Sequence, residues 1–252
     1  MAERFKGKVA LITGGVSGIG LATARLLVAE GARIAVCDIN AQAGEALVKS
    51  LPSGSVRFTQ CDVTDDDQVK RFVEDAVNAL QRLDVVFNNA GMLVCTPLTE
   101  IEPDIWDKVY AVNVKGAFLV CRHAIPALKA SRGGAIINMA SLAGLRGMPG
   151  LTLYASTKSA VIGLSKTLAL ELAPDNIRVN AICPGWIDTP FNQPVIEALG
   201  GPDAVAGAVA AGIPLGRMGS VEEVAAMVAY LASEEASFVT GQHMSINGGA
   251  YG

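Results

Sequence analysis

Hydrophobic residues along the chain fall into short runs that alternate with longer amphipathic stretches. The short runs are rich in Val, Ile and Ala and end at Gly, Asp or Asn, which predicts buried β-strands. The predicted strands are Val9–Ile12, Arg33–Cys37, Val56–Gln60, Val85–Asn88, Ala135–Met139 and Arg178–Ile182, with a last one near Gln242–Ile246.

The stretches between these runs carry apolar residues at helical spacing. They predict helices over Ile19–Glu30, Ala41–Leu51, Asp66–Leu80, Ile105–Ala130, Tyr154–Leu172 and Val221–Ala232. Strand–helix alternation implies a parallel sheet with helices on both faces. The predicted fold class is therefore α/β, a doubly wound, Rossmann-type sheet of about seven strands. No repeat or linker divides the chain, so residues 1–252 are expected to form a single domain.

The composition argues against several classes of function. Hydrophobic residues make up 51% of the chain and charged residues 17%, which suits a well-packed core. The net charge of -4 gives no electrostatic reason to bind nucleic acid. No apolar run approaches the roughly 20 residues of a membrane span. The N-terminal residues lead into too few apolar ones for a signal peptide, so a cytoplasmic protein is expected.

The cysteines and histidines show no ligand spacing. His123 and His243 are the only histidines and lie far apart, so no metal site is expected. The cysteines form no Cys-x-x-Cys motif and are expected to be reduced core residues. They are Cys37, Cys61, Cys95, Cys121 and Cys183.

A glycine-rich turn, Thr13–Gly20, follows the first predicted strand and precedes a helix. Its glycines allow a tight turn and a close approach to a pyrophosphate, and the helix N-terminus offers free N–H groups. The spacing departs from the commoner Gly-x-Gly-x-x-Gly fingerprint, and a turn without a ligand is the alternative. Asp38 lies about 20 positions further on, where a ribose-binding carboxylate is expected. The alternative is a solvated loop aspartate.

Tyr154 and Lys158 stand four residues apart in a predicted helix and therefore share one face. A tyrosine hydroxyl ordinarily has a pKa of about 10. A neighbouring ammonium favours the phenolate and lowers that pKa, which gives a proton donor and acceptor usable near neutral pH. Taken alone, such a pair is more often just two polar residues on the exposed edge of a helix, because the motif is frequent by chance.

With the segments around them, these motifs resemble the short-chain dehydrogenase/reductase family over nearly the whole chain. Each motif is weak alone, but their joint order and spacing are specific. They are Thr13-Gly14-x-x-x-Gly18-x-Gly20, Asp62-Val63, Asn88-Asn89-Ala90-Gly91, Tyr154-x-x-x-Lys158 and Pro184-Gly185-Trp186-Ile187-Asp188-Thr189.

The resemblance implies hydride transfer between NAD(H) and a secondary alcohol or ketone, with Asn113, Ser141, Tyr154 and Lys158 as the catalytic set. Tyr154 is expected to be the acid/base, and Lys158 to lower its pKa and hold the nicotinamide ribose. Ser141 is expected to hydrogen-bond the substrate oxygen. Asn113 is expected to hold a water that connects Lys158 to solvent. The alternatives are a capping serine and an asparagine that only bends its helix.

The resemblance also predicts the cofactor site. NAD(H) is expected rather than NADP(H), because the Asp38 carboxylate would repel a 2′-phosphate. Ser17 and Ile39, where a compensating base would stand, are neutral, and Arg33 begins its strand. The predicted cofactor residues are Gly14, Ser17, Gly18, Ile19, Asp38, Asp62, Val63, Asn89, Ala90, Gly91, Tyr154, Lys158, Pro184, Gly185, Ile187 and Thr189.

The expected substrate region carries few charges, which favours an uncharged or largely apolar substrate over a sugar phosphate. It includes Met92–Val94, Leu142–Pro149 and a substrate loop over about 186–215. Two other functions stay open: a non-redox enzyme of the same fold, and a nucleotide-binding sensor. The first tends to lose the glycine turn and the lysine, and the second its catalytic residues, but all are present here.

A homotetramer is expected. The stretches Asn113–Ala130 and Tyr154–Leu172 are too apolar for each to leave one face in water. The family commonly buries such helices between subunits and often makes another contact through the C-terminal segment, here Gly241–Gly252. Two-fold axes are a common closed symmetry for such an assembly.

Overall fold

The seven predicted strands pair in parallel into one sheet, which confirms the predicted fold class. The structure is a computed structural model that describes residues 3–251, and its sheet has the order β3-β2-β1-β4-β5-β6-β7. The strands are β1 (Val9–Thr13), β2 (Arg33–Asp38), β3 (Val56–Gln60), β4 (Val85–Asn88), β5 (Gly134–Met139), β6 (Ile177–Pro184) and β7 (His243–Ile246).

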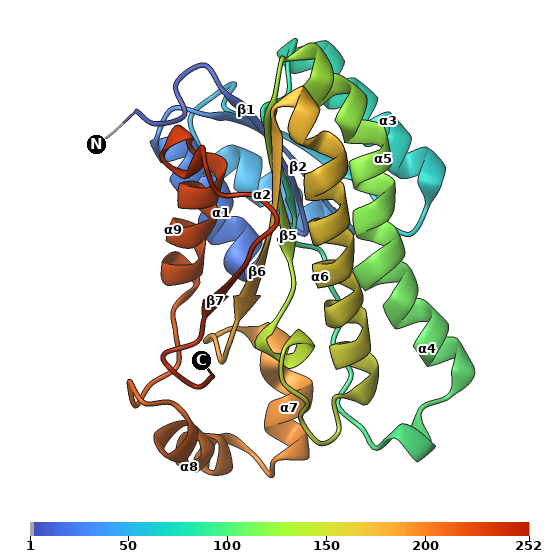
Figure 1. Cartoon of the computed structure of the whole chain (residues 1–252), viewed down its shortest axis with the longest axis vertical. Helices are drawn as coiled ribbons and strands as arrows, with labels where there is room; N and C mark the ends of the chain where they lie inside the picture. Colours follow the sequence, from blue (N-terminus) through green and yellow to red (C-terminus); the bar gives the residue numbers. More distant parts are fainter. Residues whose placement is uncertain (1–2, 252) are drawn as a thin grey trace.

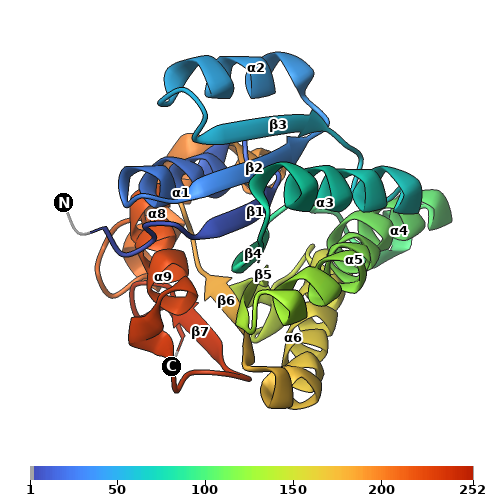
Figure 2. The same cartoon turned by 90° about the horizontal axis from the view of Figure 1, so that it is seen from above.

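Helices cover both faces of this sheet (Figure 1, Figure 2). A hydrophobic core lies on each face of the sheet, and alternate residues of β1 pack into one or the other. Leu11 packs on one face and Ile12 on the other. One face carries α1 (Gly18–Ala29) and α9 (Val221–Ala232), with α2 (Ala41–Ser50) beside β3. The other carries α3 (Asp66–Leu80), α4 (Pro103–Tyr110), α5 (Gly116–Ala130) and α6 (Thr152–Leu172). Within residues 3–251 no helix is both long and apolar enough to cross a membrane.

The stretch expected to be one helix, Ile105–Ala130, is divided in the structure. Helices α4 and α5 are joined by a wider π-helical turn at Ala111–Lys115. Asn113 lies in this turn and directs its amide out of the helix, where it bonds both the N–H and the C=O of Met92. These bonds hold the asparagine at the place where the helix widens, as is frequent at functional sites.

The predicted substrate loop contains two helices, so its description as a loop is wrong. They are α7 (Gln193–Ala198) and α8 (Pro202–Gly212), and both lie beyond the carboxyl end of the sheet (Figure 1). Proline in the first turn of each and the alanines of α8 are helix signals that the loop prediction overlooked.

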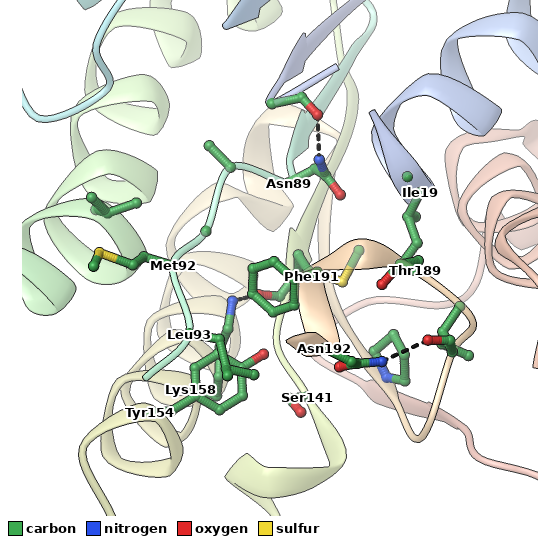
Figure 3. Close-up of a pocket in the computed structure, with 18 of the residues that line it drawn as sticks. Ile19, Asn89, Met92, Leu93, Ser141, Tyr154, Lys158, Thr189, Phe191 and Asn192 are labelled. Carbon is green, nitrogen blue, oxygen red and sulfur yellow. Dashed lines mark hydrogen bonds between the residues drawn. The ribbon is translucent and has the colours of Figure 1, made fainter. Parts of the chain in front are cut away.

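The strand order reverses at β1, which lies between β2 and β4. In open α/β sheets such a switch point leaves a crevice outside the carboxyl ends of the strands, where ligands bind. Here the segments that follow β1, β2, β4, β5 and β6 all line one cavity (Figure 3). The topology therefore brings together motifs that lie far apart in the sequence.

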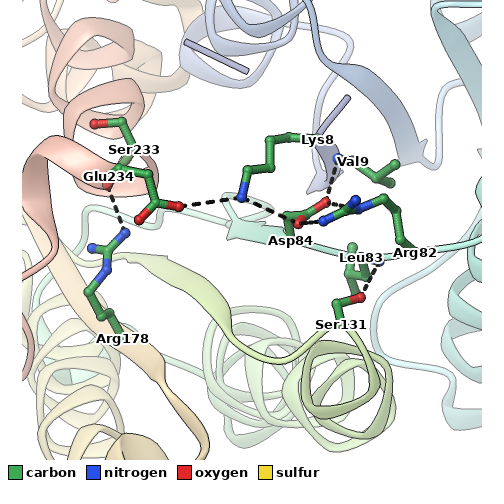
Figure 4. Close-up of polar contacts among 9 residues, drawn as sticks. All are labelled: Lys8, Val9, Arg82, Leu83, Asp84, Ser131, Arg178, Ser233 and Glu234. Atoms are coloured by element: carbon green, nitrogen blue, oxygen red, sulfur yellow. Dashed lines mark hydrogen bonds and ion pairs between the residues drawn. The ribbon is translucent and has the colours of Figure 1, made fainter. Parts of the chain in front are cut away.

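A buried carboxylate fixes the opposite end of the sheet (Figure 4). Asp84, 5% exposed, accepts hydrogen bonds from Val9 N at 2.9 Å and from the Arg82 guanidinium at 2.6 and 2.8 Å. Lys8 Nζ lies 3.7 Å from the same carboxylate. The Asp84 backbone bonds Val9 on one side and Ala135 on the other, so the cluster joins β1, β4 and β5.

We expect Asp84→Ala to lower the free energy of unfolding by about 3 kcal/mol, because it leaves Val9 N and the Arg82 side chain without their charged acceptor. Asp84→Asn keeps an acceptor for Val9 N and should cost less. Urea-induced unfolding measures both variants. Asp75→Ala, at an exposed position of α3, is the control and should stay within about 0.5 kcal/mol of the wild type. An equally small change for Asp84→Ala would show that the cluster contributes little.

Candidate active site

A cavity of about 760 Å³ lies over the carboxyl ends of the strands (Figure 3). Ser141 and every predicted cofactor residue line it, from Gly14 on the first loop to Thr189 beyond β6. Asn113 does not line this cavity and lies beside a separate, much smaller one. The fold therefore gathers the predicted cofactor and catalytic residues, with one exception, around a single space.

The glycine turn adopts a tight backbone conformation that favours glycine at two positions. Gly14 and Gly18 have φ of 62° and 49°, in the left-handed region that favours glycine. A Cβ on Gly14 would come within 2.9 Å of Ala90 Cα, so the turn packs closely on the loop after β4. The Asn89 side chain donates to the Gly14 carbonyl at 2.8 Å and fixes that contact. Helix α1 begins at Gly18, and the unpaired N–H groups of its first turn suit an anion.

The part of the cavity beyond β2 is lined by a carboxylate. Asp38 ends β2, and one of its carboxylate oxygens accepts from Asn40 N at 3.1 Å. Arg33 lies at the other end of the same strand and donates to the Leu80 carbonyl. Across the described part of the chain, the cations that line the cavity are Lys108 and Lys158. These surroundings bear on the choice of cofactor, because a carboxylate repels a phosphate.

Tyr154 and Lys158 lie on successive turns of α6 at the floor of the cavity. Tyr154 is 6% exposed and Lys158 is 2% exposed. The Lys158 ammonium lies 5.5 Å from the centre of the Tyr154 ring and donates to the Met139 carbonyl, at the end of β5, at 2.8 Å. Burial disfavours the ammonium and lowers the pKa of Lys158 to about 8.

The pKa of Tyr154 moves in the direction opposite to the sequence prediction. Burial raises the pKa of its hydroxyl, because it disfavours the phenolate, and the neighbouring Ser141 hydroxyl only partly opposes this shift. Lys158 does not counter the effect of burial on this hydroxyl in the structure. The expected lowering of the Tyr154 pKa by Lys158 is therefore not observed, and burial sets the direction of the shift.

The side chains of Ser141 and Asn113 both make hydrogen bonds within the protein that stabilise the fold. Ser141 Oγ accepts from Ala143 N at 3.1 Å and caps the short turn Leu142–Gly144, but the residue still lines the cavity. Asn113 Nδ2 donates to Thr157 Oγ1 at 3.0 Å, and that hydroxyl donates to the Tyr154 carbonyl at 2.7 Å. Asn113 thus links the π-helical turn to the first turns of α6. The water predicted at Asn113 remains a prediction.

The remaining wall of the cavity is apolar. The Phe191 ring lies 6.2 Å from the Tyr154 ring, and the other large apolar residues here are Leu93, Met148, Leu151, Trp186 and Val195. Lys108, Val112 and Asn192 also line the cavity. Sequence analysis singled out none of them, although Asn192 lies within the predicted substrate loop. No local motif marks them. Only the position of α4 and the helices beyond β6 brings them to the site.

Known proteins with similar sequences and structures cover nearly the whole chain. Residues 14–251 match the model of a family described as enoyl-(acyl carrier protein) reductase. The chain is 44% identical over 249 residues to the 3-oxoacyl-(acyl-carrier-protein) reductase FabG of Thermotoga maritima, covering 98% of each. It is 39% identical over 251 residues to a cyclohexanol dehydrogenase of Acinetobacter sp., covering 98% of this chain and 96% of that one. The crystal structure of levodione reductase matches with a TM-score of 0.93 at 35% identity, over 97% of this chain and 98% of that one.

The lowered pKa of Lys158 predicts a pH-dependent stability. The unfolded lysine keeps its proton up to about pH 10.5, whereas the folded one releases it from about pH 8. The unfolded state binds more protons in this window, so stability rises with pH. Relative to Lys158→Met, the wild type should gain about 2 kcal/mol between about pH 7 and pH 10.

Urea-induced unfolding at a series of pH values measures this difference. Lys166→Met, at an exposed position of the same helix, is the matched control and should follow the wild type. Parallel pH profiles for the wild type and Lys158→Met would show that burial does not perturb this lysine.

Proposed function

The chain belongs to the short-chain dehydrogenase/reductase family, and from this premise we propose that it transfers a hydride between NAD(H) and an uncharged, largely apolar secondary alcohol or ketone. Membership makes it an oxidoreductase that acts on CH–OH groups and implies a nicotinamide cofactor. One observation carries the finer proposal. The buried pair Tyr154 and Lys158 lies in one cavity with the glycine-rich turn and an apolar wall.

Tyr154 is the proposed acid/base. In ketone reduction its hydroxyl gives a proton to the substrate oxygen, and in alcohol oxidation it takes one back. Ser141 Oγ hydrogen-bonds the same oxygen as charge develops on it. When bound, the nicotinamide ring supplies or accepts the hydride, and its oxidised form carries a positive charge. A positive charge beside Tyr154 opposes the effect of burial and lowers the pKa of its hydroxyl.

The proposed cofactor is NAD(H), for an electrostatic reason. Asp38 lines the cavity at the end of β2, and Ile39 next to it is 69% exposed and neutral. A 2′-phosphate here would bring like charges together, at a cost of a few kcal/mol at an effective dielectric of about 20. Arg33 points its guanidinium at Leu80, at the amino end of the sheet, and offers no compensation.

The proposed substrate is neutral because the wall near Tyr154 is apolar. Trp186, Phe191 and Val195 provide one side of it, and Leu93 and Met148 contribute from other segments. The relatives act on quite different compounds by their names, an acyl thioester of a carrier protein and a ring alcohol. The apolar wall favours the second class.

We place the enzyme in the cytoplasm, because its cysteines are free thiols, as is usual in a reducing compartment.

We also propose a homotetramer. Large apolar side chains lie exposed on the helix faces that the sequence marked as too apolar for water, with Phe118 on α5 and Leu170 on α6. Phe238, fully exposed, lies just before β7, and a Cβ on Gly241 would lie 3.6 Å from Ala169 Cβ. The segment that carries Phe238 therefore passes beside the end of α6 that carries Leu170. A second copy of this chain would cover these patches about two-fold axes.

Oxidation of a panel of secondary alcohols, followed by the absorbance of reduced nicotinamide, tests the activity. For an alcohol that is oxidised, we expect Tyr154→Phe to lower kcat at least about 100-fold, because the proton acceptor is lost. The dissociation constant of NAD⁺ should stay close to that of the wild type. Lys158→Ala should damage both kcat and cofactor binding. Near-normal kcat for Tyr154→Phe at every pH would refute the acid/base assignment.

The cofactor preference is tested by kcat/KM with NAD⁺ and with NADP⁺. The wild type should prefer NAD⁺ at least about 100-fold, in line with a repulsion of a few kcal/mol. Asp38→Ala should lose most of this preference, because the like charge is gone. Asp67→Ala, at an exposed position of α3, should keep it. A wild type that prefers NADP⁺ would contradict the proposal.

The assembly is tested by sedimentation equilibrium at micromolar concentration. We expect a tetramer for the wild type and a dimer for Leu170→Glu, because a buried charge would break one of the two-fold contacts. Lys166→Glu, a charge change at another exposed position of α6, makes a useful comparison. A monomeric wild type would rule the assembly out.

A further inference from the structure

The side chain of Asn192 has a fixed orientation at the cavity. Its Nδ2 donates to the Ile187 carbonyl at 2.6 Å. A carbonyl oxygen can only accept, so the amide nitrogen must face Ile187. The amide oxygen Oδ1 therefore points to the opposite side, into the cavity, as Figure 3 shows. No donor among residues 3–251 hydrogen-bonds this oxygen.

The segment that carries Asn192 is well anchored. The Asn192 N–H bonds the Thr189 carbonyl at 3.2 Å. Two further backbone hydrogen bonds, both of 2.9 Å, hold the start of the segment to Gly219. Asp188 N donates to the Gly219 carbonyl, and Gly219 N donates to the Trp186 carbonyl. The Asn192 oxygen is thus a preorganised acceptor rather than a mobile surface group.

The surroundings of this acceptor are apolar. Phe191 precedes it, and Val195 and Trp186 lie on the same side of the cavity. A wholly apolar substrate that filled this space would remove water from Asn192 Oδ1 and leave it without a partner, which is costly. A substrate that carries a hydroxyl there would satisfy it, and sites of this kind reject analogues that lack the group.

We propose that Asn192 Oδ1 accepts a hydrogen bond from a substrate hydroxyl other than the one that is oxidised. The substrate class is then an uncharged, otherwise apolar diol, or the corresponding hydroxy ketone. This inference rests on the proposed function and narrows it. Tyr154 and Ser141 hydrogen-bond the reacting oxygen, and Asn192 accepts a hydrogen bond from a second hydroxyl in the same cavity.

The test compares cyclohexanol with each positional isomer of cyclohexanediol. The readout is the selectivity, which is kcat/KM for the best diol divided by kcat/KM for cyclohexanol. We expect a selectivity of about 10 for the wild type, as one hydrogen bond to a neutral group allows. Asn192→Leu should reduce it to about 1 or less. The ratio cancels any general loss of activity that follows from breaking the Ile187 contact.

Phe191→Leu is the matched control, because it alters the same segment and the cavity wall but not the acceptor. It should change both kcat/KM values and keep the selectivity. A wild-type selectivity near 1, or one that survives in Asn192→Leu, would overturn the inference while leaving the proposed function intact.

If the enzyme oxidises neither cyclohexanol nor a diol, calorimetric titration of the enzyme–NADH complex gives the same comparison from dissociation constants. A diol that binds about 10-fold tighter than cyclohexanol to the wild type, but not to Asn192→Leu, supports the role of Asn192. Equal binding overturns it. Failure of the proposed function itself appears separately, as a lack of NADH formation with every alcohol in the panel.

Discussion

Burial of a phenol and an ammonium on adjacent turns of one helix is the constraint on which the site depends. Water is excluded from both groups, so each is pushed toward its neutral form: the pKa of Tyr154 rises and that of Lys158 falls to about 8. Two contacts partly compensate: Lys158 Nζ donates to the Met139 carbonyl, and the Ser141 hydroxyl opposes part of the Tyr154 shift. Burying these two polar groups lowers the stability of the protein, and packing elsewhere in the fold must offset that loss.

The surrounding structure holds that pair in place. The end of β5 supplies the carbonyl that binds Lys158, and its register with β4 and β6 fixes the position of that carbonyl. The π-helical turn before α5 directs Asn113 at Thr157, which in turn bonds the Tyr154 backbone. Gly91 fits between these groups, since a Cβ there would lie 3.5 Å from Asn113 Oδ1 and 3.6 Å from Lys158 Nζ. The end of β5, the π-helical turn and the loop that carries Gly91 therefore together surround the Tyr154–Lys158 pair.

The sequence predicted the sheet and most of the site because both follow from local patterns. Buried strands such as β1 show as apolar runs, and the turn at Gly14 and Gly18 requires glycine for its backbone conformation. The pKa of Tyr154 could not be predicted, since it depends on burial by segments far away in the chain. Asn192 lies within the predicted substrate loop, but its role could not be predicted for a similar reason: it depends on a bond to Ile187 and on an otherwise apolar wall. The helices of residues 193–212 were missed because both are short and the small residues of α8 mark no distinct apolar face.

We expect the pKa of the buried Tyr154 hydroxyl to fall when positively charged NAD⁺ binds beside it in the cavity. ¹³C NMR of the tyrosine ring carbon that bears the hydroxyl measures this most directly, with Tyr154→Phe to assign the resonance. Without cofactor, Tyr154 should resist ionisation beyond the ordinary tyrosine pKa of about 10. With NAD⁺ bound, its pKa should fall by more than about one unit, and with NADH it should fall less. If the pKa of Tyr154 is the same with and without NAD⁺, the cofactor does not tune this hydroxyl.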